Sequence, residues 1–327
     1  MPQRPPWWII LRIGAMPSLP PGAWRSRVCR RRLGGPSPAT TEGNVPGRAM
    51  AILSVGCILT AASWIAAWSH FGVLTEFSFF PLWLGYILTL NGLAEIVAGT
   101  SLLTRMRWSF AWLFGVSAPF WWFFEGMNEI VQNWHYHLPH SISSTQYFVQ
   151  ATIDFSTVVP AALSASFLSF TIVRRFRVAV IAHIRVKHSH LAILSLLGTL
   201  SFSLLALFPQ ETFPLVWIAP ILILEPIAYA IGYPSLLRDV ERRNPTLIAT
   251  IMLGTLFTGI WWELWNYYSL PKWTYTVPYV GFWKVFEMPI VGYLGYPFFG
   301  LIIFTYTGIM LTLMTGKRLD DIFRSAR

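Results

Sequence analysis

Long apolar segments recur along the chain, separated by short polar or aromatic stretches. A helix needs about 20 predominantly apolar residues to cross the hydrocarbon core of a bilayer. Eight segments have that length and composition, at residues 50–69, 78–103, 108–130, 146–173, 190–208, 213–234, 246–268 and 283–315. The pattern predicts an all-α fold, a polytopic transmembrane helix bundle of about eight spans, with a kink in the last span at its Gly and Pro residues.

The same order of residues occurs twice. The segment 51–54 returns at 192–195, and the Ser-Leu-Leu of residues 101–103 returns at 235–237. Each copy also carries a Glu-x2-Asn pair followed by a Trp-x-Tyr pair: Glu125, Asn128, Trp134 and Tyr136 in the first, and Glu263, Asn266, Trp273 and Tyr275 in the second. Each copy holds four spans, so both enter the membrane from the same side. We expect two parallel four-helix repeats with a cavity between them.

Composition and charge placement support a membrane protein. Hydrophobic residues make up 54% of the chain, charged residues 12%, and the mean hydropathy is +0.52. Every Lys and Arg except Lys272 and Lys284 falls on one side of the eight-span arrangement or in the segments that flank it. This positive-inside pattern predicts cytoplasmic N- and C-termini in a bacterial-type inner membrane, with the lipid bilayer as partner. No basic cluster accompanies a nucleic-acid motif, so we predict no nucleic-acid partner.

Five regions follow from these patterns. Residues 1–47 form a basic, Pro-rich tail expected to be disordered or to precede the true start, for which Met50 is a candidate. Residues 48–178 form transmembrane repeat 1 and 190–316 form repeat 2. Residues 179–189 form a basic cytoplasmic linker, either lying on the membrane surface or solvated. Residues 317–327 form a cytoplasmic C-terminal tail.

Carboxylates within the apolar segments are the candidate chemistry. Placing such a group at the centre of a bilayer costs roughly 2.5–3.5 kcal/mol on the insertion scale, so it usually faces the bundle interior and serves a function. We predict four catalytic acids, Glu125, Glu263, Asp154 and Glu287, all at similar depth near the outer face. Candidate substrate-binding residues are Asn128, Asn266, Trp134, Tyr136, Trp273, Tyr275 and Trp262. The alternative is that these acids only hydrogen-bond across helices, which we favour for Glu95 and Glu225.

Aromatic and histidine clusters surround these acids. Aromatic faces stabilise a cation by about 0.5–2 kcal/mol each, which suits a site that protonates an alkene and shelters the carbocation. Their alternative role is an interfacial belt facing lipid. His135, His137 and His140, with His70 on the same side, have a spacing that could ligate a metal, but the second copy lacks them and no Cys assists. We therefore predict no metal and no cofactor.

The segment from Trp262-Glu263 through Trp273-x-Tyr275 to Phe286-Glu287-Met288-Pro289 resembles the lycopene cyclase domain of the heterodimeric and fused bacterial, archaeal and fungal type. The likeness covers residues 213–300 and, more faintly, 80–170. It implies two homologous transmembrane halves and a non-redox, acid-catalysed cyclisation of the ends of a carotenoid. The family's Pro-x-Glu-Glu motif is absent, and a single Glu287 precedes Pro289.

Three functions are compatible with these patterns. The first is an isoprenoid-modifying enzyme of the cyclase type, acting on a hydrophobic small molecule at the carboxylate site. The second is a proton- or cation-coupled transporter that uses the same acids. The third is a non-catalytic membrane scaffold. The sequence does not indicate an oligomeric state.

Overall fold

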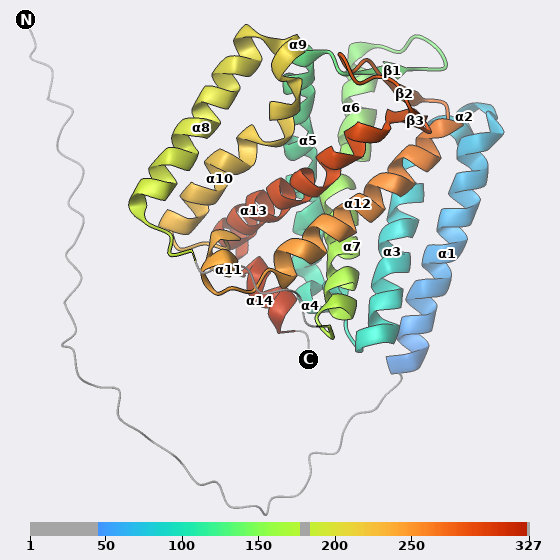
Figure 1. Ribbon diagram of the computed structural model, residues 1–327. Helices are drawn as coiled ribbons and strands as arrows, with labels where there is room; N and C mark the ends of the chain where they lie inside the picture. The colour runs from blue at the N-terminus through green and yellow to red at the C-terminus, as the bar shows by residue number, and fades with distance from the viewer. Residues whose placement is uncertain (1–44, 177–183, 326–327) are drawn as a thin grey trace, which may run out of the picture. The chain divides into compact units, whose positions relative to one another are not determined.

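The computed structural model describes residues 45–176 and 184–325, which form a helical bundle with two short strand pairs (Figure 1). The longer helices are α1 (Val45–Ser69), α3 (Phe79–Ala98), α5 (Ala111–Val131), α6 (Ser144–Phe155), α7 (Val158–Val173), α8 (His188–Leu207), α10 (Ala219–Ala230), α12 (Thr246–Tyr267) and α13 (Gly295–Thr315). Short helices connect them: α2 (Gly72–Glu76), α4 (Leu102–Met106), α9 (Pro209–Thr212), α11 (Leu237–Glu241) and α14 (Leu319–Arg324), with 3-10 turns η1 (Arg107–Phe110), η2 (Phe213–Trp217) and η3 (Ile290–Leu294). The strands are β1 (Trp134–His137), β2 (Lys272–Tyr275), β3 (Lys284–Val285) and β4 (Met288–Pro289).

Within the described residues, seven helical stretches are long and apolar enough to cross a membrane. They are Gly47–Ser69, Phe79–Ala98, Ser144–Val173, His188–Leu207, Pro209–Ala230, Thr246–Tyr267 and Ile290–Thr315. The chain is therefore a multi-pass integral membrane protein in contact with the lipid bilayer. Each stretch coincides with one of the predicted spans.

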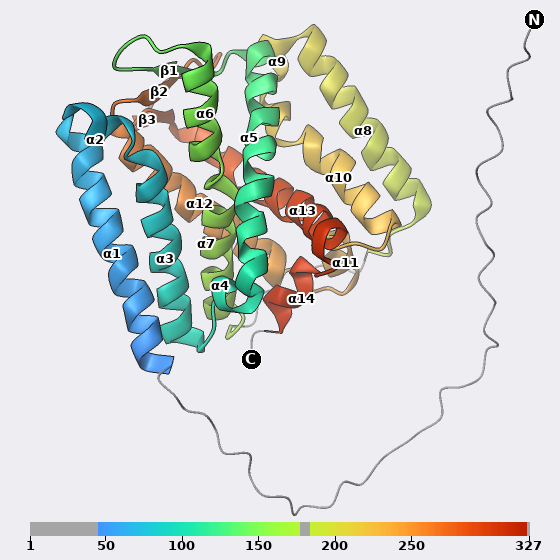
Figure 2. The same cartoon turned by 180° about the vertical axis from the view of Figure 1, so that it is seen from behind.

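The remaining predicted span, residues 108–130, corresponds to α5, which is not among these seven apolar stretches. Its length of 21 residues is sufficient, but Glu125, Asn128 and Glu129 lie in its last two turns and lower its hydropathy. Figures 1 and 2 both show α5 beside α7 within the bundle. The count of spans supported by length and composition is seven rather than eight.

The last predicted span begins later than expected. Residues 284–289 form the antiparallel pair β3–β4, in which Lys284 faces Pro289 and Val285 faces Met288. Helical structure starts at Ile290 and becomes an α-helix at Gly295. Glu287 therefore lies in a hairpin turn, not on a transmembrane helix as we expected.

Helix α7 lies at the centre of the bundle. In both ribbon views it runs between α3 and α5, with α12 crossing it (Figures 1 and 2). Gly254 of α12 permits this crossing, because a Cβ there would lie 2.4 Å from the Cα and N atoms of Ser166 in α7. The close approach places the second half of the chain directly against the first.

One end of the bundle carries α4, α11 and α14, while the β-strands lie at the other end (Figure 1). Each of these three helices has an arginine in its last turn: Arg105, Arg238 and Arg324. The segment predicted as a C-terminal tail contains α14, whose Leu319 and Phe323 are fully buried. Arg324 of α14 forms an ion pair with the buried Asp239 of α11. The predicted N-terminal tail up to residue 44, and residues 177–183 at the linker, lie outside the described residues.

Candidate functional site

Strands β1 and β2 join the two halves of the chain at one end of the bundle. They pair antiparallel, with Trp134 opposite Tyr275 and Tyr136 opposite Trp273. Because alternate residues of a strand point to the same face, these four side chains share one face of the pair. Trp134 and Trp273 are buried, so that face is turned toward the helices. The two Trp-x-Tyr segments therefore meet in a single element.

Two buried asparagines fix the start of these strands. Asn128 donates from Nδ2 to the Trp134 carbonyl at 2.8 Å and accepts from the backbone N–H groups of Asn133 and Trp134. Asn266 donates to the Trp273 carbonyl and accepts from the Trp273 N–H, both at 2.8 Å. Side-chain amides thus satisfy backbone groups that leave the helix. Both residues hold the site in shape, and neither lines the cavity described below.

Glu125 accepts three hydrogen bonds on one oxygen. The indole N–H groups of Trp121 and Trp134 donate to Oε1 at 2.7 and 3.2 Å, and the Tyr136 hydroxyl donates to the same atom at 2.7 Å. An indole nitrogen only donates, so this oxygen is held as an acceptor. The half-buried carboxyl group is thereby fixed behind Tyr136 and the two tryptophans.

Glu263 has a different set of partners. It is fully buried, and its Oε1 accepts from the hydroxyls of Tyr275 and Tyr296, each at 2.6 Å. Oε2 is also buried and has no hydrogen-bond partner among the described residues. Trp273 donates its indole N–H to the Tyr275 hydroxyl at 2.7 Å instead of to the acid. Phenols both donate and accept, so the two hydroxyls bonded to this carboxyl group can pass a proton onward.

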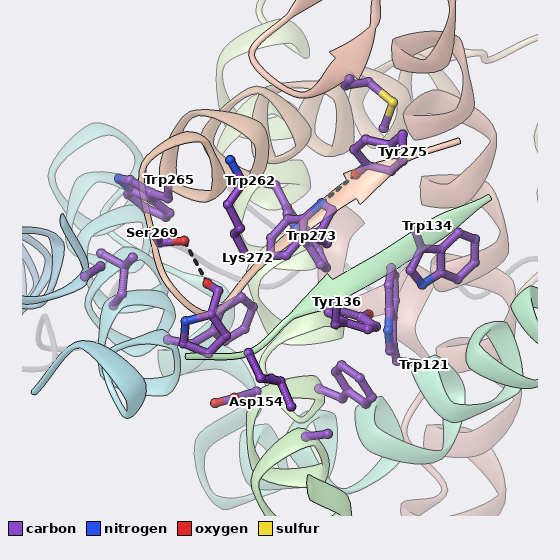
Figure 3. Close-up of a pocket in the computed structure, with 18 of the residues that line it drawn as sticks. Trp121, Trp134, Tyr136, Asp154, Trp262, Trp265, Ser269, Lys272, Trp273 and Tyr275 are labelled. Atoms are coloured by element: carbon purple, nitrogen blue, oxygen red, sulfur yellow. Dashed lines mark hydrogen bonds between the residues drawn. The ribbon is translucent and has the colours of Figure 1, made fainter. Parts of the chain in front are cut away.

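A cavity of about 180 Å³ lies beneath the β1–β2 pair (Figure 3). Its lining is predominantly apolar and aromatic and comes from both halves of the chain. Six predicted site residues line it: Trp134, Tyr136, Asp154, Trp262, Trp273 and Tyr275. For comparison, a dry cavity of about 150 Å³ admits benzene. The space therefore accommodates a ring-sized group rather than a whole polyene chain.

The remaining predicted acids lie outside this lining. Glu125 and Glu263 sit behind the phenols that face the cavity, so they reach it only through Tyr136, Tyr275 and Tyr296. Glu287 pairs with Lys272, with 2.6 Å between Nζ and Oε1. Of the four predicted catalytic acids, only Asp154 faces the cavity directly.

Sequence patterns missed several residues of this site. Tyr296, Lys272, Tyr147 and Phe299 line the cavity without having been singled out. Tyr296 lies at the start of α13, and the first copy of the repeat has no equivalent tyrosine that would have indicated its importance. Lys272 immediately precedes the Trp-x-Tyr motif, and this position next to predicted site residues is the sequence feature that indicates it.

The two phenols on the strands are neutral donors. Burial raises the pKa of Tyr275 well above its usual value, and the neighbouring Glu263 raises it further. Burial and Glu125 act on the pKa of Tyr136 in the same direction. Because the charged form of each phenol is disfavoured, both hydroxyls keep their protons at neutral pH.

Three of the histidines considered as metal ligands have separate partners. His137 hydrogen-bonds Thr274 at 2.8 Å, His140 lies 3.5 Å from the carboxylate of Glu76, and His70 contacts the Tyr268 carbonyl. Within residues 45–176 and 184–325, no group of three or more His, Cys, Asp or Glu side chains is placed to hold a metal ion.

Two other buried acids hold turns at the opposite end of the bundle. Glu225 accepts from the Ser235 hydroxyl and from the backbone N–H groups of Leu236 and Leu237. Glu95 accepts from Thr104 and pairs with Arg48 at 3.3 Å. The contacts agree with the packing role favoured for both acids.

No protein-family model, curated protein or solved structure matches this chain. The likeness to the lycopene cyclase domain thus gains no support from a family match. Fold and site together define a multi-pass helical membrane protein with an aromatic cavity under a strand pair.

Proposed function

We propose that the protein is a membrane enzyme that modifies the end group of a hydrophobic, isoprenoid-like substrate by acid–base chemistry without net redox change, as in a carotenoid cyclase. The observation that carries the proposal is the meeting of two acid–phenol pairs at one aromatic cavity. Tyr136 connects Glu125 to the cavity at 2.7 Å, and Tyr275 connects Glu263 at 2.6 Å. Apolar pockets with a few convergent polar groups are typical of small-molecule sites.

The proposed reaction begins with proton transfer through a phenol. The Tyr275 or Tyr296 hydroxyl gives its proton to a substrate double bond, and the carboxyl group of Glu263 replaces that proton on the phenol oxygen. Trp121, Trp262 and Phe299 surround the resulting carbocation with aromatic faces, each worth about 0.5–2 kcal/mol to a cation. The substrate then loses a proton to the same phenol oxygen while the phenol passes its own proton to the Glu263 carboxylate, which restores the enzyme with no gain of atoms or electrons.

The two acids have different roles in this scheme. Two obligate indole donors fix Oε1 of Glu125 as an acceptor, which suits a charge that stabilises the cation. Glu263 accepts from two phenol hydroxyls, which suits proton transfer. Asn128 and Asn266 position the strands, and Trp134 and Trp273 line the cavity. Glu287 acts through Lys272 in this scheme and does not contact the substrate.

The proposal includes an origin by duplication, giving two parallel four-helix repeats in which α5 is the eighth span. Three repeated contacts support it: the asparagine–tryptophan pairs, the acid–phenol pairs and the self-complementary register of β1 and β2. The Ser-Leu-Leu turns add a fourth, because the Leu103 N–H donates to Asn91 and the Leu237 N–H donates to Glu225.

Orientation and location are part of the same proposal. The end with α4, α11 and α14 carries Arg105, Arg238 and Arg324, whereas Lys272 and Lys284 lie at the strand end. By the positive-inside rule, the α14 end faces the cytoplasm and the cavity lies near the outer face of a bacterial-type inner membrane. Both termini are then cytoplasmic.

Expression in a bacterial host that makes linear carotenoids tests the proposed function. The wild type and Tyr86→Phe are expected to change the isoprenoid profile measured by liquid chromatography and mass spectrometry. Tyr86 is a buried phenol bonded to Thr258 outside the cavity lining, so it is a matched control. Glu263→Gln and Tyr275→Phe are expected to abolish the change.

Three results would count against the proposal. If both substitutions leave the profile of an active background as in the wild type, the acid–phenol pair has no catalytic role. If the wild type converts no isoprenoid, the substrate class is wrong. If reconstituted vesicles instead show proton-coupled uptake that Glu125→Gln removes, the transporter alternative is favoured.

A further inference from the structure

The cavity has a polar end as well as an aromatic one. In Figure 3, Asp154, Ser269 and Lys272 lie away from Tyr275 and Trp134. Gln150 of α6 and Glu76 of α2 also line the cavity. A substrate made only of hydrocarbon would offer these groups no polar contact of its own, so polar capacity that the protein does not use at this end would stay unpaired, which is unfavourable.

Most donors at the polar end are already used by the protein. The Ser78 hydroxyl donates to the Thr75 carbonyl at 2.7 Å, and the Gln150 amide donates to the Glu76 carbonyl at 2.8 Å. The Lys272 ammonium donates to the Glu287 carboxylate at 2.6 Å and to a backbone carbonyl. The Tyr147 hydroxyl can donate or accept and does not distinguish between ligands. Most of the donor capacity at this end is therefore used within the protein, with one N–H left on Gln150 and one on Lys272.

Asp154 provides acceptor capacity instead. A carboxylate offers about four acceptor positions. Within the described residues, Asp154 accepts a hydrogen bond from the backbone of Phe80 at the start of α3. That bond anchors Asp154 to α3 and leaves further acceptor positions on a side chain that faces the cavity. A ligand that carries a donor complements this end, whereas a carbonyl, carboxylate or phosphate does not.

We propose that the substrate of the proposed enzyme is a hydroxylated isoprenoid whose hydroxyl group donates to Asp154 while its hydrocarbon part occupies the aromatic end of the cavity. The inference rests on the proposed function and names its substrate class. Asp154 is then a residue that determines specificity rather than one that transfers the proton.

Binding to the full-length protein in lipid nanodiscs, measured by isothermal titration calorimetry, tests this inference. The probes are geraniol, geranyl methyl ether, which keeps the oxygen but lacks its hydrogen, and geranylamine. The wild type is expected to bind geraniol at least tenfold more tightly than the ether. Asp154→Asn keeps a carbonyl for the backbone of α3 but loses the charge and an acceptor oxygen, so its preference should fall to threefold or less.

A matched control is Glu129→Gln, which neutralises an exposed acid of α5 outside the cavity lining. It should keep the tenfold preference, and the unfolding temperatures of all three proteins should agree. An unchanged preference in Asp154→Asn, no preference in the wild type, or no binding of any probe would overturn the inference. Tighter binding of geranylamine than of geraniol would replace the hydroxyl with an organic cation.

The two proposals fail in distinguishable ways. If Glu263→Gln and Tyr275→Phe abolish conversion but the wild type does not prefer geraniol, only the hydroxyl inference is wrong. If the preference depends on Asp154 but no isoprenoid is converted, the cavity is a binding site and the proposed enzyme is wrong.

Discussion

Replacing Gly254 with alanine should separate the two central helices. The added Cβ would lie 2.4 Å from two backbone atoms of Ser166 and 2.7 Å from the backbone carbon of Ala165. Ordinary contact begins at 3.4 Å, so α12 and α7 must move apart by about 1.0 Å. No side-chain rotation relieves the clash, because the atoms that it meets belong to the backbone.

The expected cost follows from two opposing effects. Overpacking a core typically costs about 1–3 kcal/mol, and alanine regains up to about 1 kcal/mol over glycine within a helix. Because the clash is with backbone atoms, the upper half of the overpacking range applies and the net loss is about 1–2 kcal/mol, which lowers the unfolding temperature by about 2 °C or more in a domain of this size. Intrinsic tryptophan fluorescence during heating, in nanodiscs, measures the change.

Gly126→Ala is the matched control for this prediction. Gly126 also lies inside a long helix, α5, but a Cβ there meets nothing within 4 Å. It should unfold at the wild-type temperature or slightly above it. An unfolding temperature of Gly254→Ala equal to or above that of the wild type would refute the close crossing of α7 and α12.

Two further substitutions test other parts of the structure. Asn266→Ala leaves the buried N–H and carbonyl of Trp273 unpaired, which costs about 1–3 kcal/mol each. Hydrogen exchange at the Trp273 amide should therefore accelerate, and the unfolding temperature should fall. An exchange rate equal to that of the wild type would contradict the assigned contacts. Arg324→Met removes the ion-pair partner of the buried Asp239 carboxylate and should destabilise the protein by about 3–5 kcal/mol. The double variant Arg324→Met with Asp239→Asn should be destabilised less than this single variant. Equal unfolding temperatures for the single and double variants would argue against that ion pair.

The sequence predicted that the chain is a multi-pass membrane protein. Seven predicted spans coincide with helices because a run of apolar residues is a local property that tertiary contacts do not alter. The repeated Glu-x2-Asn and Trp-x-Tyr motifs marked side chains that meet in space. The motifs alone did not show that Asn128 and Asn266 bind backbone groups, because that depends on how the chain turns after each helix.

The errors have physical causes in particular segments. Residues 283–289 are apolar enough to extend a span, but a hairpin forms there and moves Glu287 out of the helix. The strands at the Trp-x-Tyr segments are not predictable from local sequence, since a strand of four residues gains its stability from a partner more than 130 residues away. Tyr296 belongs to the site only through the packing of α13 against α12, which no local pattern encodes.

The pairing of β1 with β2 also limits how the molecule can move. A carrier that exposes its site alternately to the two sides would need the strand ends of its halves to separate, and here four residue pairs of backbone ladder lie across that gap. Each opening would break the ladder and free the strands from their asparagine anchors. A ligand that reaches this cavity therefore has an easier route sideways, from the lipid and between helices, than through a parting of the two halves.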